Sequence, residues 1–225
     1  MSVRRGPRLP LEELAPYLLS TDCGSRAADS QGNPQWIDWR AVFGNNHPVE
    51  LELGFGKGLF LIAAGQTRPG VNFAGVEIVR KYQLFTATRL AKRNLRNVRV
   101  ACADARRFLP ACVATASLQA VHVYFPDPWW KTRHHKRRVF TTEFVAECTR
   151  ALRPGGSFHA ATDVEEYARV MTELLSQQPA LRPLPPPDER EPAHDLDYLT
   201  NFERKFRKQG KTIFRMSYER SEGLS

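Results

Sequence analysis

The stretch that decides the fold is Val49-Glu50-Leu51-Glu52-Leu53-Gly54-Phe55-Gly56-Lys57-Gly58, which the apolar run Leu59 to Ala64 follows. The first five residues predict a short strand, and the apolar run opens a helix. The glycines between them let the backbone turn tightly and approach a ligand closely, while the helix N-terminus presents free N–H groups. This order of strand, glycine-rich turn and helix is typical of the nucleotide-binding first unit of a doubly wound α/β sheet.

The rest of the chain continues the alternation of strands and helices. Strands are predicted at residues 72–78, 98–103, 121–125, 157–161 and 212–218. Helices are predicted at residues 80–95, 106–114, 141–152, 165–177 and 200–206. Arg153-Pro154-Gly155-Gly156 is expected to end the helix at 141–152. The pattern therefore favours a doubly wound, mostly parallel sheet.

The 225 residues are enough for one sizeable domain with its own core. Residues 1–47 are irregular, and we interpret them as a partly flexible N-terminal arm with one short helix near residues 11–19. Residues 48–225 are expected to form a single Rossmann-like domain. Within it, the proline-rich segment 179–193 is interpreted as a flexible crossover rather than as a recognition segment.

Three acidic residues, Glu52, Glu77 and Asp104, close or nearly close the first three predicted strands. Doubly wound sheets bind ligands at this edge, and an acid about 20 residues after the glycine turn can accept hydrogen bonds from ribose hydroxyls. One such acid could be an ordinary helix N-cap, but three at successive strand ends are hard to explain in that way.

A second informative stretch runs from Val121 to Arg138 and reads V-H-V-Y-F-P-D-P-W-W-K-T-R-H-H-K-R-R. It joins a predicted strand to a carboxylate, Asp127, then to two tryptophans and a dense cationic block. The net charge of +9 also suggests a polyanionic partner, although general basicity would explain it too. A carboxylate at a strand end beside aromatic rings and cations indicates a site that acts on a nucleic-acid base.

Other features carry less information. The four cysteines form no C-x-x-C pair, and His134-His135 lacks the further ligands of a metal site, so no metal is expected. No N-terminal apolar region or membrane-length run is present in the sequence, so the expected location is cytoplasmic. The cations of the helix at 80–95 are interpreted as a solvated helix face rather than as an RNA contact.

The glycine spacing Glu52-x-Gly54-x-Gly56-x-Gly58 resembles motif I of S-adenosylmethionine-dependent methyltransferases rather than a dinucleotide fingerprint. From about Val49 onward the chain resembles the bacterial tRNA (guanine-N7-)-methyltransferases, above all in the block from Pro126 to Arg138. It departs from that family at Trp130, where the family usually has proline or histidine. The resemblance implies the seven-stranded class I methyltransferase sheet, S-adenosylmethionine as methyl donor, and N7 of guanine 46 in the tRNA variable loop as acceptor.

The resemblance also implies the site residues. The cofactor is expected at Glu52, Gly54, Gly56, Gly58, Glu77, Asp104, Ala105 and Asp127. The substrate is expected at Lys131, Asp163, Thr200, Asn201, Phe202 and Glu203. The tRNA phosphates are expected at Arg133, His134, His135, Lys136, Arg137 and Arg138.

Asp127 is the expected catalytic residue. Because guanine N7 carries a free lone pair at neutral pH, no general base is needed. We therefore expect Asp127 to hold the base and to balance its new positive charge rather than to remove a proton. Trp129 either stacks on a base or packs the loop.

Three alternatives remain open at this stage. Another S-adenosylmethionine-dependent methyltransferase, acting on protein or a small molecule, would explain the glycine turn but not the cationic block. A nicotinamide-dependent dehydrogenase is disfavoured by the glycine spacing. A non-catalytic RNA-binding protein of the same fold is disfavoured by the intact acids. No membrane or protein partner is implied, and the chain is expected to be a monomer or a homodimer.

Overall fold

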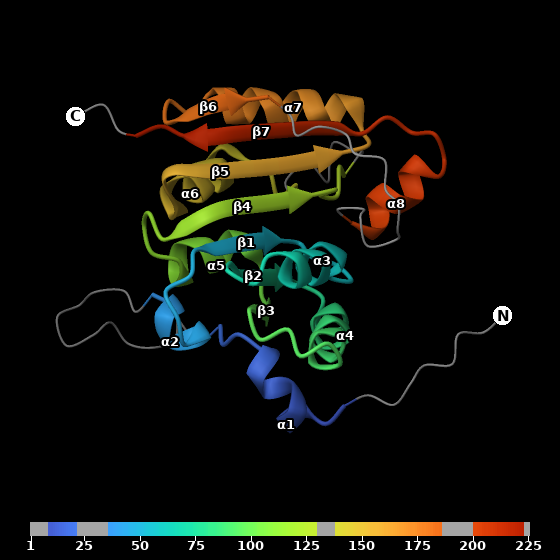
Figure 1. The fold of residues 1–225 in the computed structure, drawn as a ribbon. Helices are drawn as coiled ribbons and strands as arrows, with labels where there is room; N and C mark the ends of the chain where they lie inside the picture. The colour runs from blue at the N-terminus through green and yellow to red at the C-terminus, as the bar shows by residue number, and fades with distance from the viewer. Residues whose placement is uncertain (1–8, 22–35, 130–137, 186–199, 223–225) are drawn as a thin grey trace.

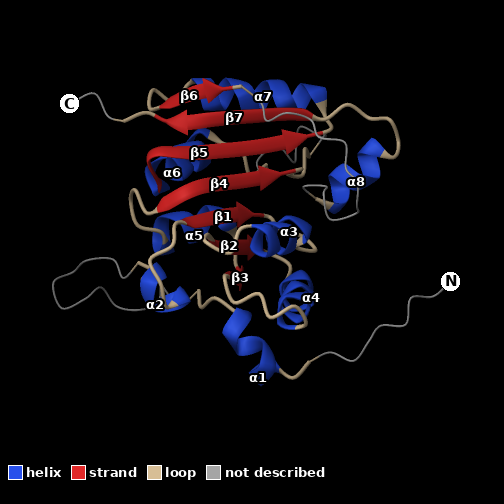
Figure 2. Ribbon diagram, in the orientation of Figure 1, coloured by secondary structure: helices blue, strands red, loops and turns tan. Residues whose placement is uncertain are grey.

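The computed structural model describes residues 9–21, 36–129, 138–185 and 200–222. A seven-stranded sheet forms its centre, with the strand order β3-β2-β1-β4-β5-β7-β6 (Figures 1 and 2). β7 is antiparallel to both of its neighbours, and the other strands are parallel to one another. The strands are β1 (Val49–Leu53), β2 (Asn72–Glu77), β3 (Val98–Cys102), β4 (Leu118–Tyr124), β5 (Leu152–Thr162), β6 (Leu181–Leu184) and β7 (Phe214–Arg220).

Helices cover both faces of the sheet, which confirms the predicted doubly wound fold. The long helices are α3 (Leu59–Thr67), α4 (Arg80–Ala91), α5 (Ala105–Cys112), α6 (Thr142–Ala151) and α7 (Glu165–Ser176). Side chains of α3 and α4 share one core cluster with the sheet, and side chains of α5, α6 and α7 share the other. No helix in the described parts of the chain is long and apolar enough to cross a bilayer. The shorter helices are α1 (Leu11–Leu14), the 3-10 helix η1 (Ala15–Tyr17), α2 (Trp39–Phe43) and α8 (Asn201–Arg207).

The described part of the N-terminal segment packs on the domain. Leu14, Tyr17 and Leu19 are buried. Leu18 forms a parallel bridge with Val100 of β3, and the Leu19 N–H donates to the Val100 carbonyl oxygen at 3.0 Å. Residues 9–21 therefore cover the outer edge of β3, where an open edge would invite pairing with other chains.

The seventh strand lies inside the segment that the sequence assigned to a crossover. β6 pairs with β7 from Leu181 opposite Arg220 to Leu184 opposite Ser217. It contains Pro183, which cannot donate to a ladder and is tolerated here because β6 is an edge strand. The crossover interpretation was therefore wrong for residues 181–184.

The helix before residues 153–156 ends as expected, at Ala151, but these residues belong to a strand. β5 begins at Leu152, directly after α6, and its pairing with β4 shifts register between Leu118 and Ala120. A Cβ at Gly156 would lie 2.8 to 3.2 Å from three backbone oxygens, so the close approach of the chain requires glycine. Gly155 and Gly156 therefore lie within the irregular first part of β5 and do not form a linker before it.

Candidate active site

The glycine turn after β1 has two different kinds of glycine. Gly54, Gly56 and Gly58 all have left-handed backbone angles, with φ of +82°, +52° and +67°. A Cβ at Gly54 or Gly56 would meet nothing within 4 Å, whereas a Cβ at Gly58 would lie 2.3 Å from Cγ2 of Thr86 on α4. The first two glycines therefore leave open space for a ligand, and the third allows α4 to pack closely.

Glu52 is a buried carboxylate without a described partner. It is 2% exposed, and its Oε2 atom has no hydrogen bond to any residue that the structure describes. Burial raises the pKa of Glu52 well above its ordinary value, and the nearby Glu77 carboxylate raises it further. A buried acid of this kind is stabilised when a cation or a strong donor reaches it. An ammonium group bound over the glycine turn would fit this requirement.

Glu77, at the end of β2, holds the glycine turn in place. Its Oε2 atom accepts from the Gly56 N–H at 2.9 Å, and its Oε1 atom accepts from the Val79 N–H at 3.0 Å. Each carboxylate oxygen can accept more than one hydrogen bond, so the group can still bind hydroxyls of a ligand. Glu77 thus joins the ends of β1 and β2 at one site.

Asp104 is the N-cap of α5, of which Ala105 is the first residue. Its Oδ1 atom accepts from the Arg106 N–H at 3.0 Å, and its Oδ2 atom lies 2.9 Å from Arg106 Nη2. The hydrogen bond from the Arg106 side chain lowers the pKa of Asp104. Asp104 is therefore an ordinary helix N-cap, a role that was not expected for all three acids.

The end of β4 carries backbone strain on both sides of Asp127. Phe125 and Trp129 have φ of +51° and +43°, values that residues with side chains rarely adopt. The Phe125 N–H donates to the Ala161 carbonyl oxygen at 2.7 Å, which continues the β4–β5 contact past the strand. Asp127 itself is exposed. It lies beside the junction of β1 and β4, where the strand order reverses and such sheets bind ligands.

α8 and the residue before it supply two of the expected substrate residues, Thr200 and Glu203, and Asp163 follows the end of β5. Thr200 Oγ1 accepts from the Glu203 N–H at 3.0 Å and so caps the helix. Glu203 is 4% exposed and forms an ion pair with Arg215 of β7 and a longer one, 3.7 Å, with Arg207. These contacts anchor α8 to the sheet. Nothing is described of the side chains of Asn201 and Phe202.

Two residues that the sequence analysis did not assign connect this region. The Lys211 Nζ atom lies 3.0 Å from Asp163 Oδ2 and 4.5 Å from the centre of the Phe206 ring. Phe206 in turn lies 5.6 Å from the Phe125 ring, between centroids. The ends of β4 and β5 and the helix α8 are thereby brought together at one edge of the sheet.

Most of the cationic block lies outside the described residues, namely Lys131, Arg133, His134, His135, Lys136 and Arg137. Arg138 is described, and its Nε atom donates to the Pro128 carbonyl oxygen at 2.7 Å. Its guanidinium carbon also lies 5.1 Å from the centre of the Tyr167 ring. Arg138 therefore ties the two ends of the block together, and its expected contact with RNA stays a prediction.

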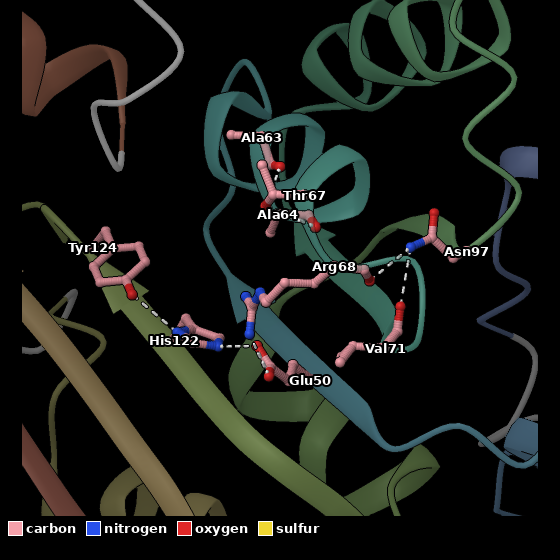
Figure 3. Close-up of polar contacts among 9 residues, drawn as sticks. All are labelled: Glu50, Ala63, Ala64, Thr67, Arg68, Val71, Asn97, His122 and Tyr124. Atoms are coloured by element: carbon pink, nitrogen blue, oxygen red, sulfur yellow. Dashed lines mark hydrogen bonds and ion pairs between the residues drawn. The ribbon is translucent and has the colours of Figure 1, made fainter. Parts of the chain in front are cut away.

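A buried polar network lies on the α3 side of β1 and β4 (Figure 3). Arg68 Nη1 donates to Glu50 Oε1 at 2.7 Å, Glu50 Oε2 lies 2.9 Å from His122 Nε2, and His122 Nδ1 lies 2.9 Å from the Tyr124 hydroxyl. Burial lowers the pKa of His122, so the ring is neutral and can donate to Glu50 while accepting from Tyr124. Burial alone would raise the pKa of Glu50, but His122 and Arg68 hold it below its ordinary value.

This network fixes the two strands that meet at the reversal of strand order. This network was not predicted from the sequence. Glu50 and His122 lie within two otherwise apolar strands, and buried polar residues of this kind indicate that they pair with each other.

Comparison with known proteins agrees with this architecture. Residues 46–216 match a family model described as "Putative methyltransferase". The chain is 40% identical over 222 residues to the tRNA (guanine-N(7)-)-methyltransferase of Rhodopirellula baltica, covering 96% of this chain and 81% of that protein. It is 37% identical over 205 residues to the corresponding protein of Pseudomonas putida, covering 88% and 85%.

Solved structures of methyltransferases share the fold. The aminoglycoside resistance methyltransferase NpmB1 matches with a TM-score of 0.57 and 17% identity, over 82% of this chain and 95% of that one. The 16S rRNA methyltransferase KamB matches with a TM-score of 0.56 and 16% identity, over 83% and 95%. The sheet is thus the Rossmann-like sheet of class I methyltransferases.

Proposed function

Because the chain belongs to the tRNA (guanine-N7-)-methyltransferase family, we propose that it transfers a methyl group from S-adenosylmethionine to N7 of a guanine in tRNA. The observation that carries this proposal is the open space over Gly54 and Gly56 beside the buried Glu52, whose Oε2 atom accepts no hydrogen bond from the described residues. The exposed Asp127 stands at the neighbouring strand end.

The residues of the glycine turn suit this cofactor. Glu52 would bind its ammonium group, because that cation stabilises the buried carboxylate. Gly54 and Gly56 would let the backbone approach the cofactor closely. Glu77 would accept hydrogen bonds from the ribose hydroxyls, and Asp104 with Ala105 would lie at the adenine ring.

When bound, S-adenosylmethionine supplies a methyl group on a positively charged sulfur. The N7 lone pair of guanine forms the new N–C bond as the C–S bond breaks, and its electron pair stays on sulfur. No proton is transferred in this step, so the protein acts mainly by aligning the two reactants. The base becomes positively charged, and the Asp127 carboxylate would hold it and balance that charge.

We assign the substrate to the edge formed by β4, β5 and α8. Asp163, Thr200 and Glu203 are described there, and Lys131, Asn201 and Phe202 complete the expected set. Arg133 to Arg138 would bind phosphates. The resemblance favours guanine 46 of the variable loop as the acceptor.

A methyl-transfer assay with labelled cofactor and unmodified tRNA transcripts tests the proposal. Label should enter the wild-type transcript, and it should be lost when 7-deazaguanine replaces guanine, because that base has no N7 lone pair. A transcript with adenine at position 46 tests the position separately. Label that persists in the 7-deazaguanine transcript would refute the acceptor atom.

The Asp127 variants test the mechanism. Asp127→Asn keeps hydrogen-bonding capacity but loses the charge, and Asp127→Ala loses both. Transfer should fall strongly in Asp127→Ala, while the affinity for S-adenosylhomocysteine should remain within a few-fold of wild type. Full activity of Asp127→Ala would remove Asp127 from the mechanism.

A further inference from the structure

The segment from residue 78 to residue 103 contains no acidic residue. It contains seven cations, which are Arg80, Lys81, Arg89, Lys92, Arg93, Arg96 and Arg99. α4 and the turn after it carry most of them, and the buried face of α4 is formed by other residues. A helix face that is only solvated would be expected to mix both signs of charge.

The outer face of α4 has an ordered pattern. Lys81, Phe85, Arg89 and Lys92 follow one another at spacings of four, four and three residues, so they lie along one stripe of the helix. Phe85 is 48% exposed, and the Arg89 guanidinium carbon lies 5.7 Å from the centre of its ring. We call these four residues the α4 stripe.

Three cations on or just after α4 have no carboxylate partner in the part of the chain that the structure describes. Among the described residues, no carboxylate forms an ion pair with Lys81, Lys92 or Arg93. Arg80 and Arg93 donate hydrogen bonds to neutral groups, the Gln83 amide oxygen and the Arg89 carbonyl oxygen.

The pattern also opposes the stability of the helix. Arg80 and Lys81 occupy the first turn, where the helix dipole disfavours cations, and Val79 provides no side-chain cap. Arg89 and Arg93 are like charges four residues apart, which is also unfavourable. The hydrogen bonds given above leave the positive charges of Lys81, Lys92 and Arg93 without a carboxylate among the described residues, and an external polyanion would balance them.

α4 is firmly attached to the cofactor turn. The Arg89 Nη1 atom donates to the Lys57 carbonyl oxygen at 2.8 Å, and Thr86 fills the space beside Gly58. Figure 1 shows α4 and α8 lying toward the edge at which the arrows of β1, β4 and β5 end. RNA held on α4 would therefore be fixed relative to the bound cofactor.

We propose that the α4 stripe is a second RNA-binding surface. Lys81, Arg89 and Lys92 contact phosphates of the tRNA away from the methylated base, and Phe85 stacks on an unpaired base. This inference rests on the proposed function for the identity of the RNA. It replaces the interpretation of these cations as a solvated face.

The test compares two variants with the same change of net charge. Lys81→Gln/Lys92→Gln neutralises the stripe, and Arg153→Gln/Arg182→Gln neutralises two exposed cations near the starts of β5 and β6, at the opposite edge of the sheet. The slope of log K for tRNA against log salt should become shallower by about 0.7 to 0.9 for each lost phosphate contact, so by about 1.4 to 1.8 in the first variant only. S-adenosylhomocysteine should bind both variants as it binds wild type, which shows that the fold is intact.

Phe85 gives an independent measurement. Phe85→Ala should weaken tRNA binding about 5- to 100-fold, and Phe85→Tyr should retain it, because only the latter keeps a stacking ring. Equal slopes for the two charge variants, or equal affinity of Phe85→Ala and wild type, would overturn the proposal. The proposal would also be overturned if Lys81→Gln/Lys92→Gln lost binding to anionic lipid vesicles while its tRNA binding stayed unchanged. Failure to methylate N7 would instead refute the proposed function, because the binding comparison does not depend on methyl transfer.

Discussion

The substitution Gly58→Ala should break the contact between the glycine turn and α4. Gly58 has φ of +67°, and the added Cβ would lie 2.3 Å from Thr86 Cγ2 and 2.8 Å from Thr86 Oγ1. Thr86 is fully buried, and a β-branched side chain in a helix has little freedom to rotate away. Either the turn or the helix must move to accept the methyl group.

The expected cost has two parts. A left-handed backbone costs a residue with a side chain about 1–2 kcal/mol. Overpacking a buried site costs about 1–3 kcal/mol more. Gly58→Ala should therefore lower the free energy of unfolding by about 2–5 kcal/mol. Gly56→Ala is the matched control, because Gly56 also has positive φ but no atom within 4 Å of the added Cβ, so it should cost only about 1–2 kcal/mol.

Urea unfolding separates the backbone cost from the packing cost. It is measured for four variants: Gly58→Ala, Gly56→Ala, Thr86→Ala and Gly58→Ala/Thr86→Ala. Thr86→Ala removes a buried hydroxyl that has no partner among the described residues, so alone it should cost little. In the Thr86→Ala background only the Cβ of residue 86 remains close to the added methyl group, at 3.1 Å, so the cost of Gly58→Ala should fall toward that of Gly56→Ala, a coupling of about 1–3 kcal/mol. Gly56→Ala should instead weaken S-adenosylhomocysteine binding, because its methyl group enters the open space. If Gly58→Ala and Gly56→Ala lose the same stability, the assignment of Gly58 to packing is refuted.

Three further outcomes are expected. Burial, with a contribution from the His122 ring, lowers the pKa of His159 from 6.5 to about 4. The unfolded chain therefore binds an extra proton between these values, and His159 removes up to about 3 kcal/mol of stability as pH falls from about 6.5 to about 4. In His159→Asn, urea unfolding should show a flatter pH dependence in this window, and an unchanged slope would contradict the argument. Arg138→Lys keeps the positive charge, but lysine cannot both donate to the Pro128 carbonyl oxygen and lie over the Tyr167 ring. The value of kcat/KM should therefore fall about 5- to 10-fold, with the salt slope of tRNA binding unchanged. Wild-type activity would favour a simple phosphate contact. Lys81→Glu places an acid in the first turn of α4 and should raise the free energy of unfolding by about 0.3–1 kcal/mol, or Tm by about 1–4 °C, while weakening tRNA binding. A lower Tm would show that Lys81 stabilises the helix after all.

The fold could be predicted from the sequence wherever local patterns decide structure. The five strands from β1 to β5 carry apolar runs, and the glycine turn identifies the first unit. β6 could not be predicted, because Leu181–Leu184 contains a proline and is a strand only through its pairing with β7. Such a pairing depends on a partner far along the chain, about which the local sequence says nothing.

The position of the candidate site could be predicted, but not the contacts of its residues. Glu52, Glu77 and Asp104 lie at strand ends as expected. The bond from Gly56 to Glu77 joins residues 21 apart, and that between Glu50 and His122 joins residues 72 apart. Patterns of period 2 or 3.6 report which face a residue occupies, and they carry no information on which distant side chain it meets.

The contacts divide the four acids at this edge into two pairs with different physical roles. Glu77 and Asp104 accept hydrogen bonds from backbone N–H groups of the chain itself, so much of their charge is used in building the site. Glu52 and Asp127 accept no such bond from the described residues, and they differ in burial. Because Glu52 is already in a low-dielectric environment, its ionised carboxylate would attract the ammonium group of the proposed cofactor strongly as soon as that group enters. Asp127 is exposed, and its interaction with a charged base is weak while water screens it. In the proposed mechanism it becomes strong only when bound tRNA excludes water, so Asp127 would stabilise the charged product only after the substrate has docked.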